Sequence, residues 1–436
     1  MKIQTVTVVG ANGAMGAAVA GVIAAFGNAR VYLVSRSYEK SEKAKERAIA
    51  SVRSDAIASR LFPVDMDELP RCVQESQWVF ESVREDYSTK SEIYRTIAAN
   101  RKPGTLVSTG TSGLSIEKLS ESFDEEGRRL FFGTHFFNPP YNLLLCEFTK
   151  TSCCNETAAE EFSNYLSETL NRRLIVTRDA PAFLGNRIGF IFLNEAAQFA
   201  ELYQDRGGID YIDAILGPFT GRSMPPLRTI DFVGLDIHKA IMDNLYDHTQ
   251  GFYHEQMRLP DYITRLIEEK RLGRKSGQGF FRTKIDENGA KQLQVYDIAT
   301  GSYRARERYS FDFAERAVAC LEEADYKGAV EQILSSESKH AKICRYFLVK
   351  YVACALESGV DICGDTDCAD IAMAYGFGWA PPQAMLELMG GVDAVCEMIC
   401  RDDRLKSSVN VERFRQAGKQ AKPCGLDYRK YFKAKL

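Results

Sequence analysis

The chain has 436 residues, of which 26% are charged, and its formal net charge is −3. This length predicts two or three domains with ample core. The charge balance gives no footprint for nucleic acid or an anionic membrane, and no window is apolar enough to span a membrane. Twelve cysteines lack zinc-ligand spacing and only five histidines are present. We therefore expect no metal site and reduced, mostly buried thiols in a cytoplasmic protein.

The N-terminus has the pattern of a nucleotide-binding unit. Residues 3–9 form a predicted strand, and Gly10, Gly13 and Gly16 follow it directly. An alanine-rich helix comes next and leads to a second strand over residues 31–34. Glycines at this place let the backbone approach a pyrophosphate at a helix N-terminus. A glycine turn that binds no ligand is the weaker alternative.

The end of the second strand bears on the choice of cofactor. Ser35 and Arg36 stand where an acidic residue would bind a ribose 2′-hydroxyl. A hydroxyl and a guanidinium accommodate a 2′-phosphate, which a carboxylate would repel. We therefore expect NADP or NAD as cofactor, with NADP modestly favoured. The alternative is that Arg36 is an ordinary surface charge.

The middle of this region continues the alternation of strands and helices. The pattern predicts a charged helix over residues 38–58, an acidic loop over 63–69, and strands over 78–80 and 106–108. Small polar residues follow the last of these strands, where an open α/β sheet holds its ligand. Ser112 among them either contacts that ligand or caps the following helix.

A histidine and a glutamate lie close together in the sequence, in an apolar setting. Phe131-Phe132 ends a buried strand ahead of His135, Pro139-Pro140 forces a turn after it, and residues 143–148 form the next strand around Glu147. A carboxylate in an apolar strand needs a partner, and a histidine held by a carboxylate is a general base. On spacing alone, a satisfied core histidine is the simpler interpretation. The motifs elsewhere in the chain favour the general base.

The C-terminal half is predicted to be helical, with an order of elements that recurs after roughly one hundred and fifty residues. The first set comprises helices over 186–201 and 210–215, Met224-Pro225-Pro226 and Gly234-Leu235-Asp236. The second set comprises helices over 345–359 and 367–374, Ala380-Pro381-Pro382 and Gly390-Gly391-Val392-Asp393. Between the sets we expect hairpins around Asn288-Gly289 and Thr300-Gly301, then a helix pair over 310–335.

Taken together, these motifs resemble those of the 3-hydroxyacyl-CoA dehydrogenases over residues 3–282. The matching segments are the glycine loop, Glu81-x-x-x-Glu85, Thr111-Ser112, His135 to Pro139, Glu147, Asp179 to Arg187, Val233 to Asp236 and Gly273 to Phe280. The resemblance implies an N-terminal α/β domain with a Rossmann-type doubly wound sheet. It also implies an all-α C-terminal region with two tandem repeats similar to the family's C-terminal domain.

The resemblance assigns roles to residues of this chain. His135 would take the proton of the substrate hydroxyl, Glu147 would orient it, and Asn186 and Ser112 would hold the substrate carbonyl and hydroxyl. The residues expected to bind the cofactor are Gly10, Gly13, Gly16, Ser35, Arg36, Glu85, Lys90 and Asn138. Gly110 departs from the family, which usually has Asn there. The helix after the second strand is also shorter, and its lysines and arginines either meet coenzyme A phosphates or form a solvated face.

The expected activity is oxidoreduction between a 3-hydroxyacyl-CoA, or a similar thioester, and its 3-ketoacyl form, as in fatty acid metabolism. One alternative is a dehydrogenase of a non-CoA hydroxy acid or a carrier-bound thioester. The alternative from another class is a non-catalytic dinucleotide-binding structural or sensor protein. We expect four domains or segments: a dinucleotide-binding domain over 1–179, a first helical domain over 180–282, a connection over 283–337 and a second helical repeat over 338–436.

The second repeat suggests how the chain assembles. Single-copy relatives are expected to pair through their helical domains, and a second copy within the chain can take the place of that partner. Residues 346–356 supply an apolar face for this contact, and Met385, Leu386 and Leu388 could add to it. We expect a monomer built as an internal pseudo-dimer, or a weak homodimer.

Overall fold

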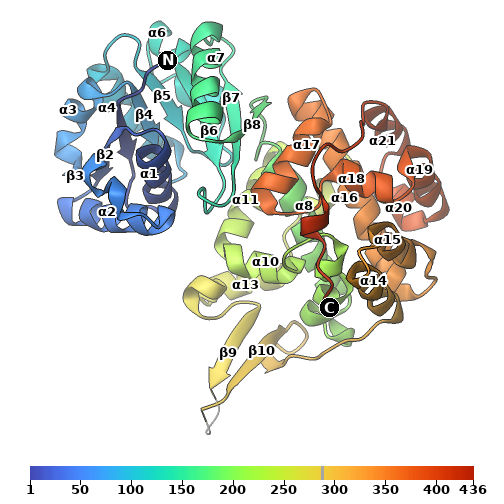
Figure 1. Cartoon of the computed structure of the whole chain (residues 1–436). Coiled ribbons are helices and arrows are strands. Elements are labelled where there is room, and N and C mark those ends of the chain that lie inside the picture. The colour runs from blue at the N-terminus through green and yellow to red at the C-terminus, as the bar shows by residue number, and fades with distance from the viewer. Residues whose placement is uncertain (286–288) are drawn as a thin grey trace. The chain divides into compact units, whose positions relative to one another are not determined.

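A computed structural model describes residues 1–285 and 289–436. The chain divides into two compact units, Met1–Phe183 and Leu184–Leu436 (Figure 1). The finer division of the second unit at residues 283 and 338 remains our proposal.

The first unit is built on an eight-stranded sheet with the order β3-β2-β1-β4-β5-β6-β7-β8. Strands β6 and β7 pair antiparallel, whereas all other neighbours are parallel. The strands are β1 (Thr5–Val9), β2 (Arg30–Ser35), β3 (Leu61–Asp65), β4 (Trp78–Glu81), β5 (Leu106–Thr109), β6 (Phe131–Phe136), β7 (Leu145–Lys150) and β8 (Arg173–Thr177). Their near-continuous apolar runs are typical of a sheet that is covered on both faces.

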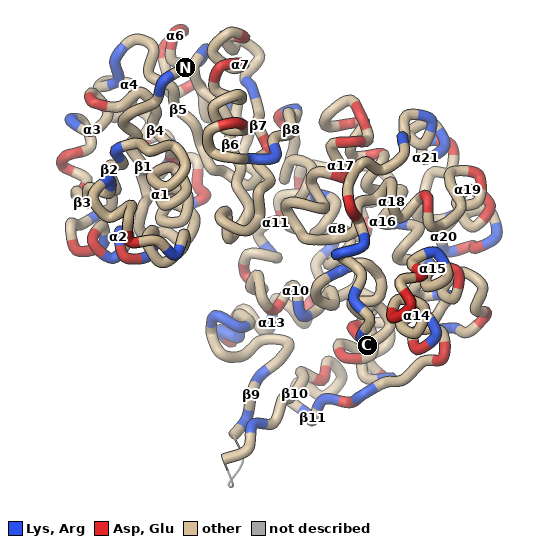
Figure 2. Tube along the Cα trace, viewed as in Figure 1, with Lys and Arg blue, Asp and Glu red and all other residues tan. Residues whose placement is uncertain are grey.

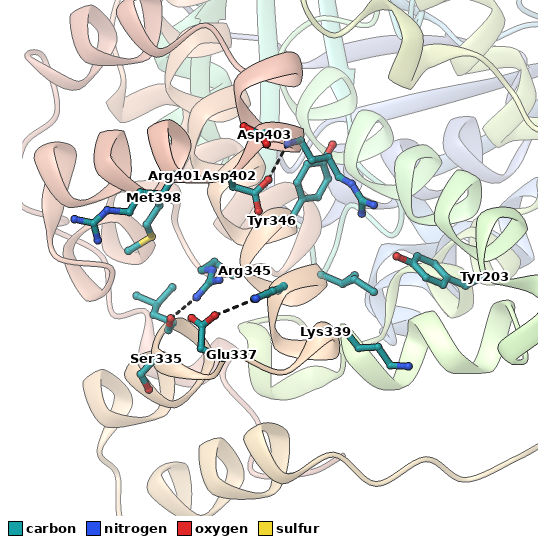
Figure 3. A pocket seen from close by; sticks show the side chains of 14 residues that line it. Tyr203, Ser335, Glu337, Lys339, Arg345, Tyr346, Met398, Arg401, Asp402 and Asp403 are labelled. Carbon is teal, nitrogen blue, oxygen red and sulfur yellow. Dashed lines mark hydrogen bonds and ion pairs between the residues drawn. The ribbon is translucent and has the colours of Figure 1, made fainter.

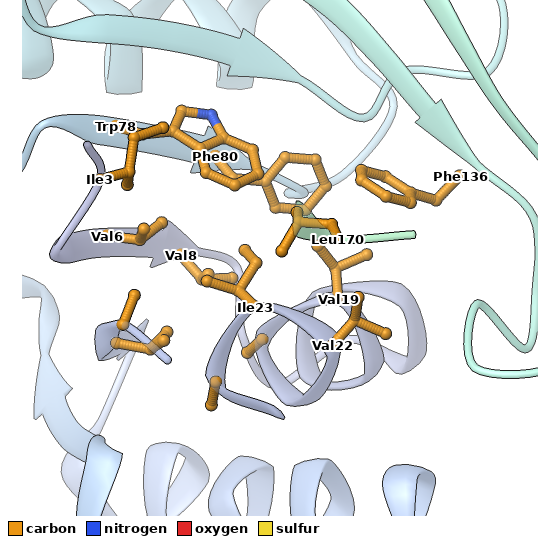
Figure 4. Close-up of a cluster of buried hydrophobic side chains, with 14 of the residues drawn as sticks. Ile3, Val6, Val8, Val19, Val22, Ile23, Trp78, Phe80, Phe136 and Leu170 are labelled. Atoms are coloured by element: carbon orange, nitrogen blue, oxygen red, sulfur yellow. The ribbon is translucent and has the colours of Figure 1, made fainter. Parts of the chain in front are cut away.

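Helices supply that cover. They are α1 (Ala14–Phe26), α2 (Tyr38–Val52), α3 (Leu69–Glu75), α4 (Tyr87–Asn100), α5 (Ile116–Ser120), α6 (Glu125–Arg129) and α7 (Glu156–Asn164). On one face α1, α2 and α7 pack over a core that includes Val8, Ile23 and Trp78 (Figure 4). On the other face α3, α4 and α5 pack over a second core that includes Tyr94 and Val107. The expected doubly wound, Rossmann-type sheet is therefore present.

One predicted loop proves to be a strand. Residues 61–65 form β3 at the edge of the sheet, where the acidic loop over 63–69 was expected, and the preceding helix ends at Val52, short of residue 58. Pro63 suggested a loop because proline cannot donate a ladder hydrogen bond. An edge strand tolerates it, since only one of its sides is paired.

The second unit is helical, as expected. Its first half contains α8 (Gly185–Leu202), α9 (Ile209–Ile215), α10 (Pro226–Val233), α11 (Leu235–His248), α12 (His254–Met257) and α13 (Asp261–Glu268). Its last part contains α16 (Lys339–Cys363), α17 (Asp367–Ala372), α18 (Pro382–Leu388), α19 (Gly391–Arg401), α20 (Asp403–Ser408) and α21 (Val411–Gly418). Among the described helices of the chain, none has the length and hydropathy that crossing a membrane requires.

Between these parts lie three antiparallel strands and a helix pair. The strands are β9 (Phe281–Ile285), β10 (Lys291–Asp297) and β11 (Ser302–Ala305), and the helices are α14 (Asp312–Glu322) and α15 (Tyr326–Ser335). The predicted turn at Thr300-Gly301 joins β10 to β11. The turn predicted at Asn288-Gly289 includes Asn288, which lies outside the described residues.

All twelve cysteines are free thiols, and within the described residues no group of histidine, cysteine and acidic side chains could hold a metal ion. Only five of the cysteines are buried, so the expectation that most of them are buried is wrong. Several lie at helix ends or in loops, where a small polarisable side chain is tolerated at partial exposure.

The two parts of the helical unit share one local hydrogen bond, in which a buried aspartate accepts a backbone N–H at the start of a later helix. Asp213 of α9 accepts the backbone N–H of Leu227 at 2.7 Å, and Asp370 of α17 accepts that of Gln383 at 2.8 Å. Each aspartate thus caps the helix that follows its own, and the two positions are 157 residues apart (370 − 213). Burial raises the pKa of Asp213 to about 7 and that of Asp370 to about 6.

An interval of 157 residues also separates two residues that contact each other. Arg222 and Trp379 form an isolated antiparallel bridge, and 379 − 222 is again 157. Nearby, Lys350 of α16 donates to Glu195 of α8 at 2.7 Å, and both side chains are almost fully buried. A position that contacts its own counterpart is what a twofold axis requires. These contacts support our proposal that two helical copies pack about a pseudo-twofold axis.

If the second copy covers the first, removing it should expose an apolar surface. We expect a chain truncated after Arg282 to aggregate or dimerise, because Phe192 and Phe199 of α8 lose their contacts with Phe347 of α16. Size-exclusion chromatography with light scattering on residues 1–282 and on the full chain measures this. A fragment that stays soluble, monomeric and active would refute the covering role of residues 338–436.

Candidate functional site

The glycine loop between β1 and α1 is shaped for close approach of a ligand. Gly10 has a φ of +83°, and a Cβ there would lie 2.4 Å from the carbonyl oxygen of Ser82. A Cβ at Gly16 would lie 2.5 Å from the carbonyl oxygen of Gly10. Gly13 occupies the N-cap position of α1, so no side chain covers the first N–H groups of that helix. The loop fits a pyrophosphate held by backbone N–H groups at the positive end of a helix dipole.

Ser35 and Arg36 stand beside this loop, because the N–H groups of Gly10 and Ala11 both donate to the carbonyl of Val34. Ser35 is the last residue of β2, and its buried hydroxyl has no hydrogen-bond partner in the described part of the chain. Arg36 is exposed.

A carboxylate that sequence reasoning missed lies next to Ser35. Asp65 ends β3, and the parallel register pairs it directly with Ser35. It was missed because residues 63–69 were expected to form a loop.

A second group of expected site residues gathers where β4 and β5 end. Lys90 is buried and lies 3.4 Å from the carboxylate of Glu85. Glu85 in turn accepts the backbone N–H of Ser112 at 2.8 Å and the hydroxyl of Thr111. The structure therefore joins Glu85, Lys90 and Ser112 in one network. The helix after Ser112 is capped by Ser115, whose Oγ accepts from the backbone, so Ser112 is not that cap.

Glu81 anchors this network and was only noted as part of a motif. Its fully buried carboxylate accepts Lys90 at 2.8 Å, Thr109 at 2.8 Å and the phenol of Tyr94. Burial raises the pKa of Tyr94 well above its usual value, which keeps this phenol a donor. The signal that could have found Glu81 is an acid at the end of an apolar strand, the same signal that marks Glu147.

Gly110 has a steric reason to lack a side chain. A Cβ at this position would lie 2.8 Å from the ring of Phe80. The asparagine that the family usually has would therefore require a shift of that ring.

His135 and Glu147 face each other across the antiparallel pair β6–β7. The register places one opposite the other, and His135 Nδ1 lies 2.6 Å from Glu147 Oε2. Glu147 is fully buried and the histidine side chain is 7% exposed. The rings of Phe137 and Phe183 pack against the imidazole, with centroids 4.7 Å and 5.7 Å away. With Glu147 ionised, Nδ1–H donates to it and Nε2 is left as the basic nitrogen.

The remaining expected residues are placed as follows. Asn138 is exposed and stands three residues after His135, at the start of the β6–β7 loop. Asn186 is the second residue of α8, buried in the helical unit. The hydrogen bond from His135 to Glu147 uses Nδ1, which leaves Nε2 as the ring nitrogen that can take another partner.

The helical unit also contains a hollow of about 750 Å³ between the start of α16 and the α19–α20 segment (Figure 3). None of the expected site residues lines it. Two of its cations already have partners: Lys342 pairs with Glu337 at 3.0 Å, and Arg345 donates to the carbonyl of Leu334. We therefore do not assign the site there.

The sequence of this chain matches those of known dehydrogenases in both units. Residues 5–180 match the NAD binding domain of 3-hydroxyacyl-CoA dehydrogenase, and residues 183–283 match its C-terminal domain. A probable 3-hydroxyacyl-CoA dehydrogenase of Deinococcus radiodurans is 30% identical over 312 residues, which cover 68% of this chain and 87% of the relative. One of Bacillus subtilis is 26% identical over 351 residues, covering 80% of this chain but only 43% of the relative.

Among solved structures, the 3-hydroxybutyryl-CoA dehydrogenase of Escherichia coli has the same fold. The two superpose with a TM-score of 0.69 over 98% of this chain and 97% of that one, at 19% identity. From the two matched domains and the Deinococcus relative, we conclude that this chain belongs to the 3-hydroxyacyl-CoA dehydrogenase family, whose N-terminal domain binds NAD.

Proposed function

We propose that this protein interconverts a 3-hydroxyacyl-CoA and the corresponding 3-ketoacyl-CoA with a nicotinamide dinucleotide. The observation that carries the proposal is the buried contact between His135 and Glu147, with Nε2 of the histidine left for substrate. Relatives named as 3-hydroxyacyl-CoA dehydrogenases support the coenzyme A thioester as the substrate class.

The chain's own residues account for the proton. As the 3-hydroxyl becomes a ketone, its proton moves to Nε2 of His135, and the carboxylate of Glu147 stabilises the imidazolium that forms. The bound dinucleotide supplies the hydride acceptor. We propose that Asn186 and Ser112 hold the substrate carbonyl and hydroxyl, and that Glu85 and Lys90 contact the cofactor near the nicotinamide.

The basic residues of α2 are the candidates for binding the phosphates of coenzyme A. Lysines and arginines of α2 alternate with glutamates (Figure 2), and Lys43 is already paired with Glu39 at 2.6 Å. The surface of α2 therefore carries charges of both signs. This favours an ordinary solvated helix face over a dedicated phosphate site.

Two alternatives to this proposed activity can be told apart from it. A dehydrogenase of a carrier-bound thioester or a free hydroxy acid would use the same His135–Glu147 pair. A non-catalytic dinucleotide-binding protein would have no need for it. The absorbance change of NADH or NADPH with acetoacetyl-CoA separates these possibilities, because only the first proposal predicts turnover of that thioester. No turnover of any coenzyme A thioester with either cofactor would contradict the proposed 3-hydroxyacyl-CoA dehydrogenase activity.

Replacing the base should abolish most of the turnover. We expect His135→Gln to lower kcat by about 10²–10⁴ while cofactor affinity is nearly kept, because the proton acceptor is lost but the glycine loop is not. Glu147→Gln should act through the same pair, so the double variant should lose much less than the two single losses combined. His248→Gln, which changes an exposed histidine of α11, is the control. Near-normal turnover in His135→Gln would end the proposed mechanism.

The residues at the end of β2 predict cofactor preference. We propose that kcat/KM is higher with NADPH than with NADH, because Ser35 and Arg36 replace a carboxylate. The double variant Ser35→Asp, Arg36→Gln should shift the ratio toward NADH. Steady-state kinetics with both cofactors measures the ratio. A wild-type preference for NADH would show that this interpretation is wrong, and Asp65→Asn would then test whether that neighbouring carboxylate binds the ribose.

A further inference from the structure

Arg172 is a buried cation next to the loop that joins the strands of His135 and Glu147. It directly precedes β8 and is 3% exposed. Its Nη1 donates to the carbonyl of Pro140, and its Nε donates to the carbonyl of Leu170 at 2.8 Å. One guanidinium therefore ties the middle of the β6–β7 loop to the segment that leads into β8.

This cation has no acidic partner within 4 Å in the described part of the chain, and its Nη2 has no hydrogen-bond partner there. Burial lowers the pKa of Arg172. A buried charge without a counterion is costly unless its hydrogen bonds offset the cost. An apolar side chain of similar size would avoid the cost, so stability alone does not explain an arginine here.

The hydrogen bond from Arg172 to the carbonyl of Pro140 acts on a short segment. Pro139 accepts the N–H groups of Asn142 and Leu143 at 3.0 and 2.9 Å, and Leu144 accepts the N–H of Arg173 at 2.8 Å. Arg172 adds a side-chain hydrogen bond to this set of backbone contacts. The loop begins directly after Phe136, the residue that follows the histidine, so its geometry sets the path of the chain beyond His135.

We propose that Arg172 is a positioning residue for this site. It holds the loop of residues 138–144 so that Asn138 and the imidazole of His135 keep the geometry that hydride and proton transfer require. The proposal rests on the proposed function, and it adds a residue that touches neither substrate nor cofactor. A displacement of about 1 Å in such a site costs on the order of a hundredfold in rate.

Three variants test the proposal. Arg172→Met keeps the volume but leaves Pro140 without its donor, and Arg172→Lys keeps the charge but cannot reach both carbonyls with a planar fork. Arg129→Met changes an exposed arginine at the end of α6 and is the control. The measurements are kcat and KM for both substrates, the pH profile of kcat, the thermal midpoint, and hydrogen exchange of the peptide that covers residues 138–144.

We expect Arg172→Met to lower kcat by roughly tenfold to a hundredfold. The kcat of Arg172→Lys should lie between those of the wild-type protein and Arg172→Met. The pH profile should keep its position, because His135 and Glu147 are unchanged, and exchange in residues 138–144 should speed up. A folded Arg172→Met with wild-type kcat, KM and exchange overturns the proposal. If that variant does not fold, wild-type values in Arg172→Lys overturn it instead. The exchange result does not depend on activity, so it stands even if the wild-type protein turns over no thioester.

Discussion

The contact between His135 and Glu147 depends on a reversal of strand direction. In a parallel pair, a crossover would have to separate the two strands. Because β7 turns back along β6, residues only twelve apart (147 − 135) come to face each other. The carboxylate is fully buried and therefore needs a hydrogen-bond partner. The imidazole provides it, and the same bond leaves the other ring nitrogen as the base.

Much of the first unit could be predicted because its signals are local. The glycines after β1 and the apolar runs of β4 and β5 each determine their own segment, and the His135–Glu147 contact needs only one reversal of the chain. Strand β3 could not be predicted in the same way. Pro63 and its acidic neighbours favour a loop, and only the pairing with β2 makes the segment a strand. Likewise, Ser112 and Ser115 both precede a helix, and the backbone decides that Ser115 is the cap.

The hydrogen-bond partners of Glu81 and of Arg172, unlike Glu81 itself, could not be predicted from the sequence for another reason. Glu81 takes its partners from α4 and β5, and Arg172 reaches a carbonyl thirty-two residues earlier. No periodicity or spacing connects such residues, because the topology of the sheet alone brings them together. Candidate site residues can thus be named from motifs, while the side chains that hold them in place require the fold.

The bridge between Arg222 and Trp379 has a consequence for how such a chain can evolve. In an assembly of identical subunits, residues that meet on a twofold axis are copies of one residue, so two arginines would repel and two tryptophans would lack a cation. Here the guanidinium of Arg222 lies 4.7 Å from the centre of the Trp379 ring, an attractive pair of unlike partners. A gene that encodes both halves can change each one separately. In the pseudo-twofold arrangement that we propose, one chain would therefore allow unlike side chains at the axis, whereas a homodimer would place identical residues there.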